Sequence, residues 1–247
     1  MFNIAIEETK IFLKVFETIN KISSNININF NEKGMFIDSI DDSSVCYIFL
    51  ECEKDFFKSY ELDCNCTIGI NVSSFLKILK CLNPSLLWEL CYKNNVFEIS
   101  TNDKSFSLTL LNIDTDSCEI PELEYDIEIS LNTKEIIDCF KDLTIFDSEE
   151  FRISTENNNM IWESFSQEGN FKKKWKYENN DIVNMLNKLD LDSKPFIFSI
   201  SYVSKFCKDI LPEIKFCFSR EFPLKMIYKE KSFSFTLYVA PRISDED

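Results

Sequence analysis

The sequence INVSSFLKILK, residues 70–80, returns in a related form as FSISYVSKFCK, residues 198–208. In both copies a short strand pattern runs into an apolar helical stripe, and Lys77 and Lys80 align with Lys205 and Lys208. Two further blocks recur in the same order: TKIFL (9–13) with TKEII (133–137), and KSFSLTL (104–110) with KSFSFTL (231–237). Three ordered matches at an offset of roughly 125 residues predict two tandem copies of one structural unit.

The repeat divides the 247-residue chain into two units of ordinary domain size. We expect a first domain at 1–110, an interdomain linker at 111–126 and a second domain at 127–247 with an acidic tail. The linker has neither helical nor alternating periodicity, and Pro121 disfavours both a helix and a central strand. It is predicted to be extended across a surface, with an ordinary polar loop as the alternative.

Hydrophobic patterning gives both halves the same order of elements. Alternating stretches in the first half predict strands at 2–7, 25–30, 35–40, 45–51, 67–71, 86–91, 96–101 and 105–111. Helices are predicted over 9–22, capped by Thr9, and from Ser73 or Ser74 to before Pro84. The second half repeats this order with helices at 133–143 and 202–211. The secondary structure of two stretches is ambiguous: 54–60 in the first half, which could be a further strand or irregular, and the acidic stretch 181–191 in the second half. Helices lying on antiparallel sheets define an α+β fold.

The amino-acid composition excludes several kinds of catalytic and ligand-binding site. The chain has no histidine, which removes the commonest general base and every Cys-His or Ser-His arrangement. Its three glycines form no phosphate-binding loop, and its ten cysteines lack paired metal-ligand spacing. We expect free thiols, no structural metal, no cofactor and no catalytic residue. Carboxylate catalysis stays open because the chain has 42 acidic residues.

Nothing in the sequence predicts a membrane association. No apolar run approaches the roughly 18 residues that a membrane-spanning helix needs. The first residues lack the basic region and cleavage site of a signal peptide. We therefore expect a protein on the reducing side of membranes, with no membrane partner.

Lysines gather on the predicted helices of an otherwise acidic chain. The net charge of −15 argues against nonspecific nucleic-acid binding by the whole surface. The lysines opposite the apolar sides of the helices are Lys10, Lys14, Lys21, Lys77, Lys80, Lys134, Lys141, Lys205 and Lys208. Solubility accounts for lysines on one helix, whereas four equivalent stripes favour contacts to a phosphate backbone without sequence readout. The 133–143 helix is the weakest member because Glu135, Asp138 and Asp142 lie beside its lysines.

Several stretches together point to one family. They are the opening Met1-Phe2, SIDDSSV (39–45), SFLKILKC (74–81), IPELEY (120–125) and YVAPRI (238–243) with its acidic end. Over essentially its whole length the chain resembles proliferating cell nuclear antigen, the eukaryotic-type DNA sliding clamp. The IPELEY linker and the closing Ala-Pro-basic-Ile-acidic pattern are specific in combination, although neither is specific alone.

The resemblance implies a head-to-tail homotrimer of two-domain subunits, closed into a six-domain ring with helices around the hole and sheets outside. Double-stranded DNA would pass through the hole without sequence recognition, and a DNA polymerase tethered to the ring would stay on its template. The resemblance places Lys14, Lys77, Lys80, Lys141 and Lys208 on this lining. Helix geometry and the repeat add Lys10, Lys21, Lys134 and Lys205.

The resemblance also implies a hydrophobic pocket under the linker for the clamp loader, the polymerase and other docking-motif proteins. Such motifs carry a glutamine, an aliphatic residue and two aromatic residues. The matching positions are Ile40, Ser44, Val45, Tyr47, Ile120, Pro121, Tyr125, Pro223, Tyr238, Val239, Ala240 and Pro241. An aliphatic and aromatic cup suits a helical turn with aromatic anchors, although Val45 and Tyr125 could belong partly to the core. Ser44 stands where clamps often carry a bulkier residue, so partner preference is expected to differ.

Further expectations concern assembly and regulation. Subunits should join by edge strands near 105–111 and 171–177, with Lys172, Lys173 and Lys174 facing acidic or backbone groups of the next copy. Residues 154–159 contain no lysine where related clamps carry one that is modified by ubiquitin, so regulation by that route is not expected. A nuclear location, or a viral replication compartment, follows from the resemblance. Two alternatives remain open: a subunit of a heterotrimeric checkpoint-type clamp, and an acidic scaffold or carboxylate enzyme without a DNA role.

Overall fold

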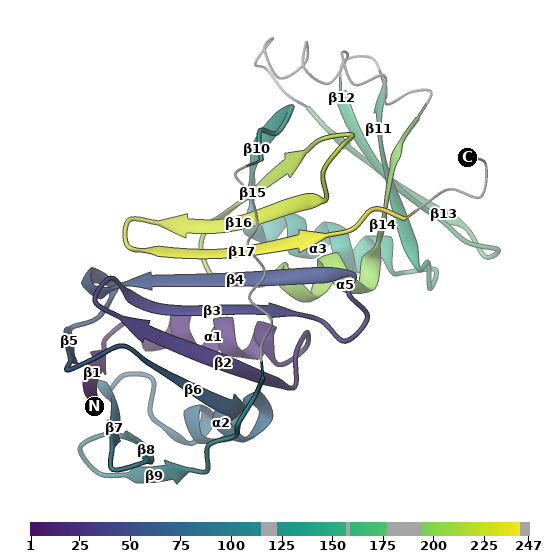
Figure 1. Cartoon of the computed structure of the whole chain (residues 1–247). Coiled ribbons are helices and arrows are strands. Elements are labelled where there is room, and N and C mark those ends of the chain that lie inside the picture. Colours follow the sequence, from purple (N-terminus) through teal and green to yellow (C-terminus); the bar gives the residue numbers. More distant parts are fainter. Residues whose placement is uncertain (115–122, 157–158, 177–193, 243–247) are drawn as a thin grey trace. The chain divides into compact units, whose positions relative to one another are not determined.

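A computed structural model describes residues 1–114, 123–156, 159–176 and 194–242 (Figure 1). Its internal contacts divide the chain into two compact units. The first comprises Met1–Ile120 with Tyr228–Thr236, and the second comprises Pro121–Ile227 with Leu237–Asp247. Each unit combines helices with antiparallel strands, which confirms the predicted α+β class.

The first unit contains two helices and two runs of antiparallel strands. Its elements are β1 (Phe2–Ile6), α1 (Thr9–Ile19), β2 (Asn25–Asn31), β3 (Gly34–Ile40), β4 (Cys46–Glu53), the 3-10 turn η1 (Lys54–Phe56), β5 (Ser59–Leu62), β6 (Cys66–Asn71), α2 (Val72–Cys81), β7 (Trp88–Lys93), β8 (Val96–Ser100) and β9 (Ser105–Leu108). One sheet has the order β5-β1-β7-β8-β9, and the other run has the order β4-β3-β2-β6. Each strand predicted in this half overlaps an observed strand, although β9 ends at Leu108, three residues before its predicted end, and β7 lies two residues later than predicted. The ambiguous stretch 54–60 forms η1 and the start of β5.

The second unit repeats this arrangement. Its elements are β10 (Ile127–Asn132), α3 (Thr133–Leu143), β11 (Glu150–Glu156), β12 (Asn159–Phe165), β13 (Asn170–Trp175), β14 (Phe196–Ser199), α5 (Ile200–Phe206), β15 (Glu213–Phe218), β16 (Leu224–Glu230) and β17 (Phe233–Val239). The strands β16 and β17 contribute residues to both units. One sheet has the order β13-β12-β11-β14, and β10 pairs with β15, which pairs with β16. The stretch 181–191 lies outside the described residues.

The helices begin at matched positions of the sequence repeat. Thr9 opens α1 and Thr133 opens α3, while Val72 opens α2 and Ile200 opens α5. Among the described helices, α1 packs on α2 within the first unit and α3 packs on α5 within the second. The predicted internal duplication is therefore confirmed at the level of secondary structure and helix pairing.

Aromatic side chains hold α1 and α2 together. The ring centroids of Phe12 and Phe16 are 4.7 Å apart, and Phe16 lies 4.8 Å from Phe75 of α2. Phe75 also stacks on Phe97 of β8 at 6.0 Å. All four rings are at most 1% exposed. Because one side of each helix is buried in this cluster, the opposite side must face solvent.

A second aromatic cluster supports α3. The ring of Phe140 lies 5.3 Å from that of Phe151 on β11 and 5.8 Å from that of Trp162 on β12. Trp162 is fully buried and lies 5.4 Å from both Trp175 and Phe216. The two units thus use the same principle, a helix pair on an aromatic core, with different side chains.

Asparagine side chains cap two of the helices. At the start of α2, the Asn71 side-chain oxygen accepts a hydrogen bond from the backbone N–H of Ser74 at 2.9 Å. At the start of α3, Asn132 accepts from Lys134 and Glu135 at 3.0 and 3.3 Å. The prediction that Ser73 or Ser74 caps α2 was therefore wrong, because the asparagine that precedes the helix satisfies its first free N–H groups.

The hydroxyl of Thr9 has a different partner from the predicted one. Thr9 is the first residue of α1, and its hydroxyl donates to the carbonyl of Pro84 at 2.6 Å. No side chain caps this helix. Thr9 therefore ties α1 to the loop after α2 instead of capping its own helix, and the predicted cap was wrong.

Two glycines mark places where the backbone approaches another segment closely. Gly34, at a φ of 151°, begins β3, and a Cβ there would lie 2.1 Å from the carbonyl oxygen of Cys52. A Cβ on Gly69 would lie 2.3 Å from the carbonyl oxygen of Leu111, whose N–H donates to the Gly69 carbonyl at 2.8 Å. The side chain of Asn27 also donates to the carbonyl of Ile113 at 3.0 Å. The first linker residues are therefore fixed along β6 and β2.

Truncation of Phe75 should destabilise the chain strongly, because it contacts both Phe16 and Phe97 in a closely packed interior. We expect Phe75→Ala to lower the free energy of unfolding by about 3–5 kcal/mol in urea titration. Phe165→Ala is the control, since Phe165 is 48% exposed and its loss should cost about 1 kcal/mol or less. Similar costs for the two variants would contradict the proposed role of the aromatic cluster.

Candidate nucleic-acid interface

The helix pair of the first unit presents lysines with few acids beside them. Lys10, Lys77 and Lys80 are exposed, Lys14 is half-buried, and α2 contains no acidic residue. The Lys80 ammonium pairs with Glu17 of α1 at 2.9 Å, which links the two helices. An exposed pair of this kind is worth at most about 1 kcal/mol, so Lys80 can still turn to an outside anion. Within the described residues, no carboxylate pairs with Lys10 or Lys77.

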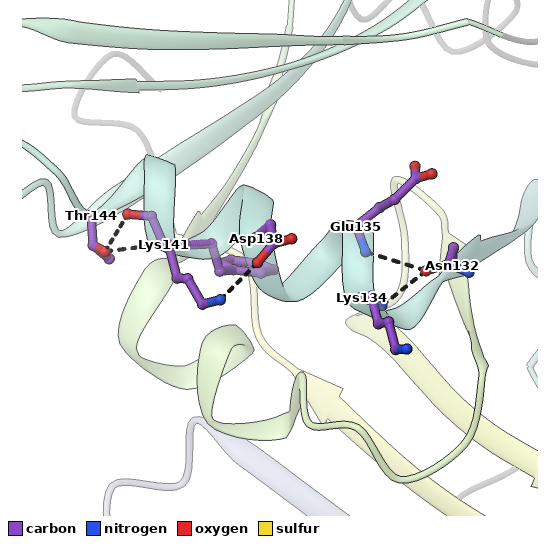
Figure 2. A network of polar contacts seen from close by, with 7 residues as sticks. Asn132, Lys134, Glu135, Asp138, Lys141 and Thr144 are labelled. Atoms are coloured by element: carbon purple, nitrogen blue, oxygen red, sulfur yellow. Dashed lines mark hydrogen bonds and ion pairs between the residues drawn. The ribbon is translucent and has the colours of Figure 1, made fainter.

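On α3 the lysines extend from one side of the helix (Figure 2). Lys134 and Lys141 extend to this side, whereas Glu135 extends to the other. The Lys141 ammonium donates to Asp138 at 2.7 Å, and this hydrogen bond lowers the pKa of the Asp138 carboxyl. Asp138 therefore stays ionised and offsets Lys141. Lys134 has no carboxylate partner among the described residues, so α3 keeps one uncompensated cation.

The remaining predicted lysines lie on α5 or just beyond helix ends. Lys205 lies on α5, with its ammonium 4.9 Å from the centre of the Tyr202 ring. The helix ends at Phe206, so Lys208 lies in the segment that follows it. Lys21 likewise follows α1 and donates its backbone N–H to Thr18 at 3.0 Å. The predicted helices were a few residues too long at these ends, and seven of the nine lysines are helical.

Two of the predicted docking residues lie together in the second unit. The Tyr125 hydroxyl donates to the carbonyl of Pro223 at 3.1 Å. Phe222 packs edge-on against the Tyr125 ring at 5.8 Å. The ammonium of Lys225 lies 5.8 Å from the centre of the Tyr125 ring and 5.5 Å from that of Tyr238. Each such cation–π contact is worth about 0.5–1 kcal/mol at an exposed position.

Phe222 and Lys225 were not predicted, although a signal for Lys225 was present in the sequence. Alternation along β16 places Lys225 on the face opposite the buried Leu224 and Met226. Burial raises the pKa of the Tyr125 hydroxyl well above its usual range, and the nearby Tyr238 adds to the rise. Tyr125 is thus a neutral hydrogen-bond donor under ordinary conditions.

The other second-unit docking residues differ in exposure. Val239 is fully buried, which makes it a core residue of β17. Ala240 and Pro241 are exposed. The backbone N–H of Arg242 donates to the carbonyl of Ile197 at 2.9 Å, which fixes the chain as it leaves β17. Ile120 and Pro121 lie outside the described residues.

In the first unit, Asp41 organises the loop that carries the predicted docking residues. Its carboxylate accepts hydrogen bonds from the backbone N–H groups of Val45 at 2.8 Å and Cys46 at 2.7 Å. Ser44 lies in this loop at a φ of 54° and is exposed. Ile40 is 46% exposed, an unusual exposure for isoleucine, while Val45 and Tyr47 are half-buried.

Comparison with known proteins assigns the chain to a family. A family model described as "Proliferating cell nuclear antigen, N-terminal domain" matches residues 1–127. The chain belongs to the proliferating cell nuclear antigen family. It is 27% identical to the proliferating cell nuclear antigen of Chaetomium thermophilum and 25% identical to that of Saccharomyces cerevisiae, with all of both chains covered in each case. It is 22% identical to a probable DNA polymerase sliding clamp of Autographa californica nuclear polyhedrosis virus, over the whole chain and 98% of that protein.

In this member of the proliferating cell nuclear antigen family, the two strands predicted to join subunits lie at sheet edges. β9 ends one sheet of the first unit, and β13 ends a sheet of the second. On β13, the Lys172 ammonium already pairs with Glu156 at 2.5 Å and Glu163 at 3.4 Å. The Lys173 ammonium lies 4.3 Å from the Trp175 ring. Two of the three lysines expected at the seam are thus engaged within their own chain.

The thiols of this family member carry no metal-binding pattern in the described residues. Nine cysteines there are free, and no group of three potential metal ligands occurs among those residues. Burial raises the pKa of Cys139 to about 12 and that of Cys217 to about 11. Cys64 and Cys81 are exposed. The described helices also include none that is long and apolar enough to cross a membrane.

The Tyr125 hydroxyl should make a pH-dependent contribution to stability. Near pH 7, Tyr125→Phe should lower the free energy of unfolding by about 0.5–1.5 kcal/mol, because the hydrogen bond to Pro223 is lost. Since the folded pKa of Tyr125 is raised, the contribution is complete below about pH 10, where the unfolded phenol begins to ionise. It declines as the pH rises further.

Urea titration of both proteins at about pH 7 and about pH 10.5 should therefore show a smaller cost of Tyr125→Phe at the higher pH. Comparison with the wild type at each pH cancels the ionisation of the other tyrosines and cysteines. A cost that does not change with pH would contradict the buried, neutral state of Tyr125.

Proposed function

We propose that the chain is a DNA sliding clamp, a processivity factor that closes around double-stranded DNA as a ring of three identical subunits. The main support is the repeated helix pair, which buries its aromatic side and turns lysines to solvent on a chain of net charge −15. Family membership supports the same function. So does the full-length similarity to a viral protein named as a probable DNA polymerase sliding clamp.

The DNA-facing surface would consist of the helix lysines and the two that follow helix ends. These residues are Lys10, Lys14, Lys21, Lys77, Lys80, Lys134, Lys141, Lys205 and Lys208. Lysine is a flexible, strongly hydrated point charge, which suits loose contacts to phosphates during sliding. The four described helices carry no arginine, so they offer no guanidinium group for bidentate hydrogen bonds to base edges. Acidic surface elsewhere would repel DNA and confine it to the hole.

Partner proteins would bind a pocket at the interdomain linker. We assign to it Ile40, Ser44, Val45, Tyr47, Ile120, Pro121, Tyr125, Pro223, Tyr238, Val239, Ala240 and Pro241. The exposed Ile40 and the tyrosine-lined surface around Tyr125 support this assignment, because aromatic anchors of a short helical motif need such apolar contacts. The partners would be a DNA polymerase, a clamp loader and other docking-motif proteins.

The proposed domains are 1–110 and 127–247, joined by the linker at 111–126. Subunits would join through β9 of one copy and β13 of the next, since both are edge strands with unpaired backbone groups. The protein would tether enzymes without chemistry of its own. It would act in a nucleus or in a viral replication compartment, and no membrane partner is expected.

A solution mass measurement tests the ring directly. We expect a single species of three 29.1 kDa chains by light scattering or sedimentation. A trimer held by pairing between edge strands should stay assembled on dilution, whereas a trimer held by a small nonspecific contact should dissociate. A stable monomer would contradict self-assembly, and a chain that associates only with two different related chains would favour a heterotrimeric checkpoint-type clamp.

Charge reversal on the helices tests the DNA-facing surface. We expect Lys10→Glu combined with Lys77→Glu to leave the trimer intact, because neither ammonium pairs with a carboxylate in the described residues. Each lost phosphate contact should lower the salt dependence of DNA association by about one unit of log slope. Retention on circular DNA and processive synthesis should therefore both decrease.

The control is Lys33→Glu with Lys93→Glu, which changes the net charge equally at two exposed lysines outside the helices of the same unit. It should leave DNA retention close to the wild-type level. Equal defects in the two double variants would show that net charge alone matters and would remove the lining assignment.

A further inference from the structure

The ammonium of Lys225 lies beside two tyrosines that the docking proposal assigns to the partner pocket. It is 5.5 Å from the centre of the Tyr238 ring and 5.8 Å from that of Tyr125. Tyr125 is itself held by its hydrogen bond to Pro223 and by the edge of Phe222. All five residues belong to the second unit, so a cation has a defined place among its docking residues.

Lys225 differs from other lysines of the chain in lacking an ionic partner among the described residues. On the adjacent strand β15, the Lys215 ammonium donates to Glu128 at 2.9 Å. On α2, Lys80 pairs with Glu17 at 2.9 Å. No carboxylate within the described part of the chain pairs with Lys225, and its ammonium lies close to the two rings.

Aromatic rings attract an ammonium group but do not replace an oxygen acceptor for its N–H groups. The ammonium of Lys225, a half-buried residue, therefore keeps both its charge and its hydrogen-bond donors available to an incoming group. A carboxylate forms the strongest contact of this kind, because its hydrogen bond is charge-assisted. Apolar rings and a docked peptide also exclude water, which reduces screening of the pair.

We infer that Lys225 makes the docking pocket selective for partner motifs that carry an aspartate or glutamate next to their aromatic anchors. This inference rests on the proposed docking function and adds to it the chemistry of the preferred partner. An acidic motif residue would pair with Lys225 while the anchors lie against Tyr125 and Tyr238. Basic residues at the same place would be disfavoured by repulsion.

The test uses the full chain and synthetic docking peptides that carry the glutamine, the aliphatic residue and the two aromatic residues. A panel places a single aspartate, or its uncharged counterpart asparagine, at each position between the glutamine and the residue after the second aromatic. Fluorescence anisotropy or calorimetry gives the affinities. At the best position we expect the aspartate peptide to bind wild type about fivefold more tightly than the asparagine peptide, with a smaller difference at high salt.

Three variants isolate the role of the ammonium. Lys225→Met keeps an unbranched apolar stem over the rings and should abolish the difference in affinity between the aspartate and asparagine peptides. Lys225→Arg keeps the charge and should retain the preference. Lys229→Met is the matched control, because Lys229 is an exposed lysine on the same strand β16, and it should behave as wild type.

The outcomes separate this inference from the docking proposal. If no peptide binds wild type, both fail. If peptides bind and Tyr238→Ala weakens them all, but aspartate and asparagine are equivalent at every position, docking stands and the role of Lys225 is overturned. A preference for aspartate that survives Lys225→Met would also overturn it.

Discussion

Burial of aromatic rings beneath paired helices is the constraint on which the rest of the structure depends. Phe12 and Phe16 cannot pack on Phe75 unless α1 and α2 lie side by side with fixed rotations about their axes. Those rotations decide which side chains are left for solvent, and the lysines are among them. The exposure of Lys10 and Lys77 is therefore a consequence of core packing.

Much of this arrangement could be predicted from the sequence, because it follows from periodicity. The predicted starts of α1 and α3 were right, since Thr9 and Thr133 open them, whereas α2 and α5 begin one or two residues earlier than predicted, at Val72 and Ile200, which are equivalent positions of the repeated blocks 70–80 and 198–208. The helix caps could not be ranked, because Asn71 and the serines after it are all good caps and only tertiary geometry selects one. The predicted ends of α1 and α5 were too late for a similar reason, as periodicity continues past the last helical hydrogen bond.

The contacts among the docking residues could be predicted only in part from the sequence. Resemblance supplied Tyr125 and Tyr238, but the contacts of Lys225 and Phe222 depend on how one strand and one loop approach each other. The sequence pattern also does not reveal which lysines form ion pairs. Two lysines of similar sequence context can differ completely, as Lys141 with its neighbour Asp138 and the unpaired Lys134 do on one helix (Figure 2). A count of nearby charges in the sequence therefore does not predict which lysines are available to bind an anion.

The distribution of thiols has a practical consequence for biophysical work. Thiolates, not thiols, react with maleimides and iodoacetamides, so the buried cysteines with raised pKa values, such as Cys139, should resist modification at neutral pH. Cys64, between β5 and β6, and Cys81, at the end of α2, are solvent-exposed in the first unit. Cys66 and Cys91 of the same unit are half-buried, so Cys64 and Cys81 are the preferred positions for a fluorophore or spin label among its described cysteines. A label at either position would report by spectroscopy on association between copies of the chain without rebuilding the hydrophobic interior.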